Sequence, residues 1–190
     1  MVSTFVFKGE YKDMAHALTY DAKMFESYYD CMIFSALHGL LNNAFDDQSV
    51  SEGEDSDSSA SANPAVVRSE IIVKYKREYC AFRRLIILNE KKRNLGPDER
   101  IDNAFKYDIF VDSNSSKQTA AISKYSENSK IIKGYVYGGL RILYEKYKDK
   151  LKNYTELLEA VDRHIHSFGE ESGLIMVGEE NVDDGDLNTL

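Results

Sequence analysis

Residues 127–150 read ENSKIIKGYVYGGLRILYEKYKDK, which is the strongest helical signal in the chain. Their apolar side chains recur every three or four positions, so a helix would place them on one face. Glycine in such a face costs about 1 kcal/mol relative to alanine. Gly139 at this position indicates that another backbone approaches too closely to leave room for a Cβ. We expect a central helix whose inner face is Ile132, Tyr135, Val136, Gly139, Leu140, Leu143 and Tyr147.

The same periodicity predicts three further long helices. They span residues 21–45, 64–94 and 153–169, the second with Asn63 as N-cap and Pro64 in its first turn. In the third, Asn153 and Glu156 have the spacing of a capping box. We also expect a short helix over 98–106 capped by Asp98, a short strand or extended segment at 2–7, a turn of helix at 14–18, and a polar loop over 111–129 with a helical turn near residue 120.

These elements predict an all-α fold, either an orthogonal or an up-down bundle of four main helices with additional short helices. A chain of 190 residues can bury a core without disulfides or metals. We expect one helical domain over residues 1–169. It is interrupted by a disordered acidic insertion at 46–63 and followed by a flexible acidic tail at 170–190.

The net charge of −8 conceals two regions of opposite sign. The 46–63 insertion contains six acidic residues and the 169–190 segment contains seven, with no lysine or arginine in either. The remaining residues hold 19 acids and 24 bases. The predicted helical body is therefore basic, with a net charge of about +5, and the two regions are suited to different partners.

The sequence predicts a cytoplasmic protein with no membrane partner. The N-terminal residues lack the pattern of a signal peptide, and no uncharged apolar run reaches about 18 residues. Cys31 and Cys80 fall among apolar neighbours, as expected of reduced thiols in a core.

Motifs for catalysis or metal binding do not emerge from the sequence. His164 and His166 would point away from each other on a helix, and no cysteine or histidine pair has zinc-binding spacing. Residues 97–99, Pro-Asp-Glu, resemble the opening of a metal-dependent nuclease signature, but the later acid and lysine are missing. No nucleophile elbow, P-loop or dinucleotide fingerprint occurs. We expect no cofactor and no metal, and we do not expect an enzyme.

One face of the predicted 64–94 helix is basic. Such an arc could follow a phosphate backbone and gain affinity by counterion release, without strong sequence specificity. A solvated helix face is the alternative interpretation. The candidate nucleic-acid-binding residues are Lys76, Arg77, Arg83, Arg84 and Lys91.

Two other features are candidates for partner binding. Gly134 and Gly138 lie four residues apart, away from the main apolar face, and either admit a second close helix or reflect tight internal packing. In the acidic tail, an apolar tetrapeptide is either a docking motif, an added edge strand, or a cover for a patch on its own domain. Its residues are Leu174, Ile175, Met176 and Val177.

Two segments, FESYYDCMIFSALHGL at 25–40 and YVYGGLRILYEK at 135–146, carry a family resemblance. Together they resemble the small helical accessory proteins of bacterial DNA phosphorothioation (Dnd) systems, over about a sixth of the chain. The 46–63 insertion and the acidic tail depart from that pattern. The matching positions are Tyr29, Asp30, Phe34, Ala36, Gly39, Tyr135, Gly138, Gly139, Leu140 and Leu143.

The resemblance implies a cytoplasmic, defence-linked protein without catalytic residues. We therefore expect a non-catalytic accessory or adaptor protein that contacts other proteins of a DNA-modification or phage-defence system. The alternative is a weakly sequence-specific DNA-binding module that uses the basic face of the 64–94 helix. A metal-dependent nuclease is the third and least supported interpretation.

Overall fold

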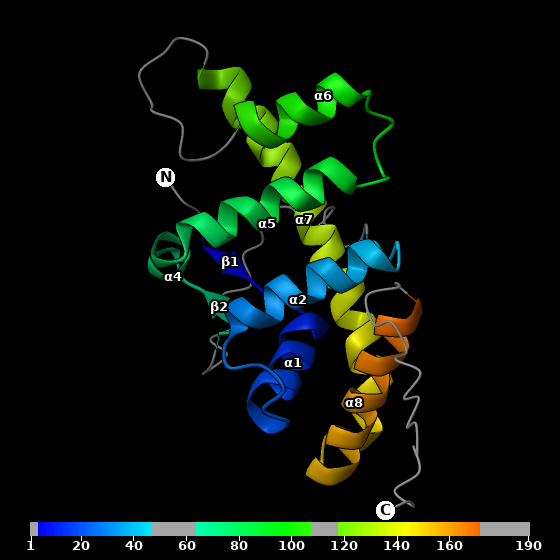
Figure 1. Cartoon of the computed structure of the whole chain (residues 1–190). Coiled ribbons are helices and arrows are strands. Elements are labelled where there is room, and N and C mark those ends of the chain that lie inside the picture. The colour runs from blue at the N-terminus through cyan, green and yellow to red at the C-terminus, as the bar shows by residue number, and fades with distance from the viewer. Residues whose placement is uncertain (1–3, 47–63, 108–117, 172–190) are drawn as a thin grey trace, which may run out of the picture. The chain divides into compact units, whose positions relative to one another are not determined.

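The computed structural model describes residues 4–46, 64–107 and 118–171 (Figure 1). Their contacts divide the chain into two compact units, with the boundary between Lys152 and Asn153. The prediction of a predominantly helical fold is confirmed, and a small two-stranded sheet is added to it. The arrangement of four main helices as one bundle stays a prediction.

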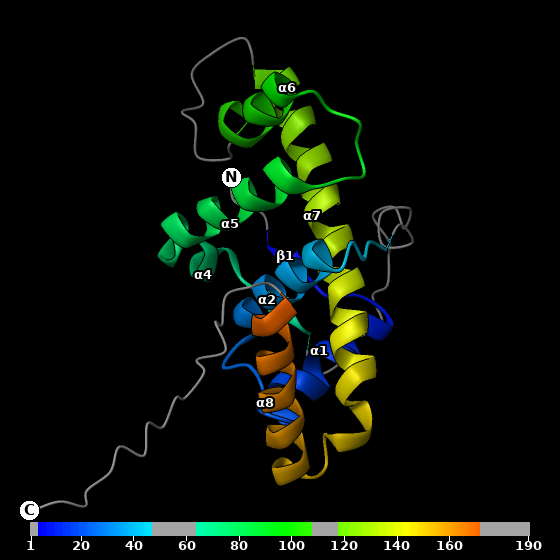
Figure 2. The same cartoon turned by 45° about the vertical axis from the view of Figure 1, so that its right-hand side comes forward.

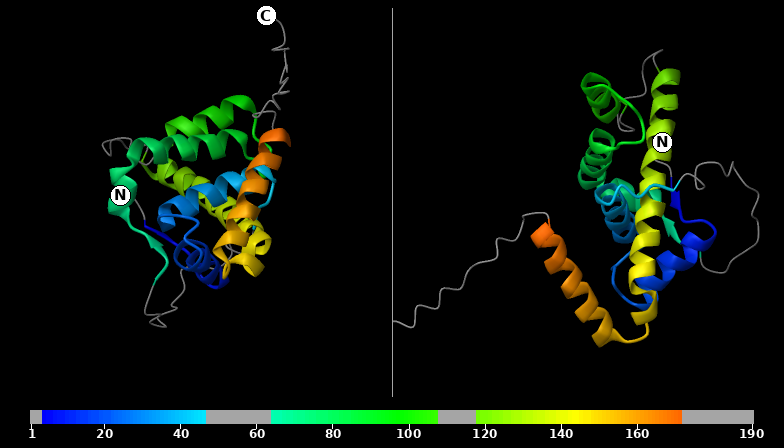
Figure 3. Two further views of the ribbon diagram at one scale, coloured as in Figure 1. Left: turned by 60° about the horizontal axis from the view of Figure 1, so that its bottom comes forward. Right: turned by 90° about the vertical axis from the view of Figure 1, so that its right-hand side faces the viewer.

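The first unit contains most of the secondary structure. In chain order its elements are β1 (Phe5–Val6), α1 (Glu10–His16), the π-helix η1 (Ala17–Asp21), α2 (Tyr28–Leu41), β2 (Val66–Val67), α4 (Ser69–Lys74), α5 (Lys76–Asn89), α6 (Pro97–Ile101), the π-helix η2 (Asp102–Lys106), α7 (Gln118–Tyr147) and the 3₁₀-helix η3 (Lys148–Lys150). Helix α7 is the central element, and α2, α5 and α6 lie along one side of it (Figures 2 and 3).

Helices α2 and α7 cross at the glycine that the sequence singled out. A Cβ on Gly139 would overlap the carbonyl oxygen of Ser35 and lie 2.5 Å from the amide nitrogen of Gly39. A Cβ on Gly39 would in turn overlap the carbonyl oxygen of Tyr135. The predicted close approach of another backbone to Gly139 is therefore confirmed, and the approaching backbone is that of α2.

The segment after α2 lies against the other two glycines of α7. The Phe45 ring occupies the space that a Cβ on Gly134 would need, and the Ala44 backbone does the same at Gly138. The Asp46 amide donates to the Gly134 carbonyl oxygen over 3.1 Å. Gly134 and Gly138 thus accommodate an extended segment of their own chain.

The sheet pairs β1 with β2 in antiparallel orientation, Phe5 opposite Val67 and Val6 opposite Val66. The amide of Phe7 donates to the Ala65 carbonyl oxygen over 3.0 Å. The expected strand near the N-terminus is confirmed. Its pairing partner lies in residues that the sequence assigned to a helix.

The predicted 21–45 and 64–94 helices have the wrong bounds. Helix α2 begins at Tyr28, where the Ser27 hydroxyl accepts from the Asp30 amide over 3.3 Å and caps the helix. The 64–94 region is divided into β2, α4 and α5, with the break between the helices at Tyr75. The β-branched residues of β2 favour a strand, and Pro64 precedes that strand instead of starting a helix.

Two more boundaries differ from the prediction. The cap of α6 is Gly96, whose amide donates to the Glu99 carboxylate over 3.1 Å, and not Asp98. Helix α7 begins at Gln118, so much of the expected 111–129 loop is helical. Its polar residues have partners: Asn128 is buried and donates to the Asn103 carbonyl oxygen over 2.9 Å.

The second unit contains α8 (Tyr154–Glu171). As predicted, Asn153 caps it: its side chain accepts from the Glu156 amide over 3.4 Å and donates to the Glu156 carboxylate over 2.6 Å. Among the described helices, none combines the length and apolarity needed to cross a bilayer. Apart from Asp46, the acidic insertion lies outside the described residues, as does the tail beyond Glu171.

Candidate functional site

An open groove of about 1150 Å³ runs beside β2, between the start of α2 and the α4–α5 pair. We call it the tyrosine groove, because four of the residues that line it are tyrosines from three separate segments. Its principal lining residues are Tyr20, Tyr28, Tyr29, Tyr75, Ile71 and Val66. All of them belong to the first unit.

The aromatic rings of the groove hold one another in place. Tyr29 stacks on Tyr75, with ring centroids 5.3 Å apart and an interplanar angle of 22°. Tyr20 meets Tyr28 edge to face at 5.1 Å. The Tyr28 hydroxyl lies 3.1 Å from Nδ1 of His16. Because Tyr20 is 54 % exposed and Tyr75 is 37 % exposed, the groove offers ordered aromatic surface to a ligand.

Tyr29 combines deep burial with an unsatisfied polar atom. It is only 6 % exposed, and no described residue is a hydrogen-bond partner of its hydroxyl. Burial, with the nearby Glu78 carboxylate as a second cause, raises its pKa to about 12. The phenol therefore stays neutral near pH 7, and its interactions are those of a ring with a hydrogen-bonding tip.

Charged residues of both signs line the groove. Asp30 accepts from the Ser27 hydroxyl over 2.6 Å and is thereby part of the α2 cap. Glu26 and Glu78 also belong to the lining, and Arg68 and Lys74 come from the α4 side. The mixture of signs does not favour a polyanion such as DNA over a polypeptide.

The five predicted nucleic-acid-binding residues do not form one exposed stripe. Lys76 and Arg77 are exposed at the start of α5. Lys91 is exposed beyond the end of that helix, where its amide donates to the Tyr135 hydroxyl over 3.1 Å. Arg84 is half-buried, with its guanidinium 5.0 Å from the Phe105 ring.

Arg83 departs most clearly from the predicted basic stripe. Only 7 % of the residue is exposed, so it is buried and not on the surface. Its guanidinium lies 4.4 Å from the ring centroid of Tyr125 and 5.7 Å from that of Tyr79. It also donates to the Ser129 hydroxyl over 3.3 Å. The contacts join α5 to α7, so this arginine stabilises the packing of the two helices.

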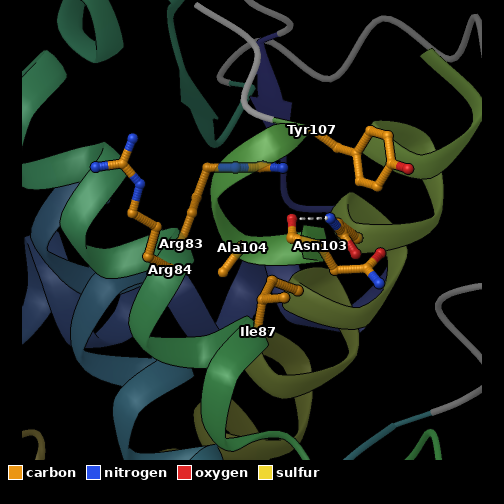
Figure 4. Close-up of a pocket in the computed structure, with 7 residues that line it drawn as sticks. Arg83, Arg84, Ile87, Asn103, Ala104 and Tyr107 are labelled. Atoms are coloured by element: carbon orange, nitrogen blue, oxygen red, sulfur yellow. Dashed lines mark hydrogen bonds between the residues drawn. The ribbon is translucent and has the colours of Figure 1, made fainter. Parts of the chain in front are cut away.

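Arg83, Arg84 and Asn103 of η2 also line a small polar cavity, and the Arg83 side chain extends toward Asn103 (Figure 4). The cavity measures about 10 Å³. That is close to the space that a single water molecule needs, about 10–15 Å³. It is therefore too small for a substrate or a nucleotide.

The partner-binding candidates fall into two groups. Gly134 and Gly138 are buried beneath residues 44–45 of their own chain, so the structure supports tight internal packing and leaves them no exposed surface. Leu174, Ile175, Met176 and Val177 lie outside the described residues.

The two cysteines lie in the core, as the sequence predicted. Cys31 and Cys80 are buried free thiols, and burial raises the pKa of Cys31 to about 11. Within residues 4–46, 64–107 and 118–171, no group of three or more histidine, cysteine or acidic side chains is placed to hold a metal ion.

Sequence reasoning missed the tyrosine groove. It placed Tyr28 and Tyr29 inside the predicted 21–45 helix, and it ran the predicted 64–94 helix through Val66 and Tyr75 without a break. The available signal was the proline followed by two adjacent β-branched residues, which is typical of an edge strand. Comparison of the chain with protein-family models, with curated proteins and with solved structures finds no match.

Proposed function

We propose that this protein is a non-catalytic adaptor that binds a partner protein through the tyrosine groove. The observation that carries the proposal is the set of ordered, partly exposed tyrosines along one open groove. Tyrosine is enriched among the residues that dominate protein–protein binding energy, because it brings a large rigid surface at low entropic cost.

The size of the groove favours a polypeptide over a metabolite. Small-molecule pockets typically measure about 300–1,000 Å³ and enclose most of their ligand. The tyrosine groove is larger, at about 1150 Å³, and it is not enclosed. A segment of a partner protein matches that shape better than a small molecule does.

The resemblance of residues 25–40 and 135–146 to Dnd accessory proteins supports a narrower form of the proposal. In that form the partner belongs to a bacterial DNA-modification or phage-defence system, and the adaptor acts in the cytoplasm. DNA binding by the exposed Lys76, Arg77 and Lys91 is the alternative function, and its test is given in the Discussion.

The proposal is tested by capture followed by direct binding. The tagged full chain is purified from its native host, co-purifying proteins are identified, and their affinity is measured with purified components. We expect Tyr20→Ala combined with Tyr75→Ala to weaken binding at least tenfold, about 1.4 kcal/mol. Tyr154→Ala is the matched control, because Tyr154 is an exposed tyrosine of α8 outside the groove. Equal affinities for the double variant and the control would overturn the proposal.

A further inference from the structure

The two outer edges of the β1–β2 sheet differ in how they are covered. On the β1 side, the Tyr137 hydroxyl of α7 donates to the Val6 carbonyl oxygen and accepts from the Lys8 amide, both over 3.1 Å. One side chain therefore occupies the Val6 carbonyl oxygen and the Lys8 amide, two of the groups that this segment turns away from β2. A further strand on this side would have to displace the Tyr137 hydroxyl, and we call this side of the sheet the closed edge.

The register shows that Val66 turns its backbone groups toward the opposite edge. The Phe7 amide bonds to the Ala65 carbonyl oxygen, so Phe7 and Ala65 form a hydrogen-bonded pair. Such pairs alternate with non-hydrogen-bonded pairs in an antiparallel ladder. Val6 and Val66 form the next pair, and the N–H and C=O of Val66 therefore point away from β1.

The edge formed by β2 is open among the described residues. No residue of the described ranges is a backbone partner of the Val66 N–H or C=O. Pro64, Val66 and Arg68, which follow this edge, all line the tyrosine groove. An outward-facing backbone donor and acceptor beside a groove can pair with another strand, and Val66 supplies one of each.

We propose that an extended segment of the partner protein binds in the tyrosine groove as a third strand, hydrogen-bonded to Val66. The inference rests on the proposed function and specifies its mode of binding. Backbone hydrogen bonds to β2 supply affinity that does not depend on the side chains of the segment. Specificity comes from the side chains that the segment turns toward the groove wall.

The groove also defines the chemistry of the segment. Successive side chains of a strand point to opposite sides, so only every second one meets the wall. Ile71, Tyr75 and Tyr28 present apolar and aromatic surface there. The matching segment is extended, with branched apolar or aromatic residues at alternate positions and polar residues between them.

A defined peptide library provides the probe. Acetylated and amidated octapeptides carry Val, Ile, Tyr or Phe at alternate positions and Ser, Thr, Lys or Glu between them, and binding to the full chain is measured by fluorescence anisotropy. The best binder is then resynthesised with a single N-methyl group at each position in turn. We expect at least tenfold weaker binding at the position whose N–H faces the Val66 carbonyl oxygen, and a much smaller effect at the two adjacent positions, whose N–H groups point away from β2. A uniform or absent effect would overturn strand addition.

Two proline variants of the protein test whether the Val66 N–H bonds to the peptide. Val66→Pro removes the N–H that faces the groove, and this N–H makes no bond to β1. Val6→Pro is the matched control, because it removes the equivalent N–H on the closed edge of the same sheet. We expect Val66→Pro to weaken the best peptide at least tenfold and Val6→Pro to leave its affinity unchanged. Equal affinities would count against the proposal.

Amide hydrogen exchange of the wild-type chain gives a second readout, which decides the matter if Val66→Pro fails to fold. The peptide should slow exchange at Val66, and unchanged exchange would overturn strand addition.

The variants also separate the two proposals. If Tyr75→Ala weakens binding of the peptide but Val66→Pro does not, the groove binds its partner in another way, so strand addition fails and the proposed function stands. If neither variant has an effect, both fail. A dimer that Val66→Pro dissociates would assign the edge to a second copy and overturn the partner segment.

Discussion

Gly39 of α2 and Gly139 of α7 lie backbone against backbone, so that a Cβ on either glycine would overlap a carbonyl oxygen of the other helix. Gly139→Ala must therefore separate the two helices. We expect a loss of about 3 kcal/mol or more in the free energy of unfolding, at the upper end of overpacking effects. Urea denaturation measures it. Gly96→Ala is the control, because the nearest atom to a Cβ there is 3.9 Å away. Similar losses in both variants would contradict the close crossing.

Leu143 is buried on α7, one turn beyond that crossing. We expect Leu143→Ala to lower the free energy of unfolding by about 2–5 kcal/mol, through lost burial and the cavity that remains. Leu85→Ala removes the same atoms from a side chain that is 46 % exposed, and its effect should be clearly smaller. Thermal melts of the two variants compare them directly. An unchanged melting temperature for Leu143→Ala would contradict the central position of α7.

Arg83 is expected to act in stability rather than in nucleic-acid binding. Arg83→Lys keeps the charge but removes the planar group that lies over Tyr125 and donates to Ser129. We expect the free energy of unfolding to fall by about 1–2 kcal/mol. Arg77→Lys, at an exposed position on the same helix, should change it by less than about 0.5 kcal/mol. Denaturant titration of the two variants decides between the two roles.

The alternative DNA-binding function depends on the basic residues that remain exposed. If it operates, the full chain should be retained on double-stranded DNA at low salt and released as salt rises. Lys76→Glu with Arg77→Glu should then abolish retention in a gel-shift assay. Lys148→Glu with Lys152→Glu reverses the same charge elsewhere on the surface and should have a smaller effect. An unchanged gel shift in the first double variant would refute this function.

Stability should fall in alkaline solution, because two buried tyrosines have a higher pKa in the folded chain than in the unfolded chain. Burial raises the pKa of Tyr147 to about 12, and burial followed by the hydrogen bond to Asp46 does the same for Tyr11. The unfolded chain loses these protons near pH 10, where the folded chain still holds them. The free energy of unfolding therefore decreases as pH rises from 10 to 12. Urea titrations across that interval should show a shallower decline for Tyr147→Phe than for the wild type, and parallel declines would contradict the prediction.

Sequence patterns predicted two kinds of feature: a helix with a continuous apolar face, and a helix cap formed by residues close together in the chain. The face around Gly139 identified the central helix and the close approach of another backbone to it, and the Asn153–Glu156 spacing identified the cap of α8. Both signals depend on residues within a few turns of one another.

The features that the sequence did not predict depend on contacts between residues that are far apart in the chain. The polar residues at the start of α7 looked like a loop, because no sequence pattern shows that Asn128 pairs with Asn103 or that Ser129 pairs with Arg83. The tyrosine groove was missed for a similar reason. Val66 belongs to a strand only because β1, some 60 residues earlier, pairs with it.

The Tyr137 hydroxyl also has a consequence for the order of events during synthesis. It bonds to Val6 and Lys8, which leave the ribosome 131 and 129 residues before it. Until then the first strand has an uncovered side and can pair with the wrong chain. Nascent chains halted before residue 137 should therefore depend more on chaperones than chains halted after the whole of α7 has emerged.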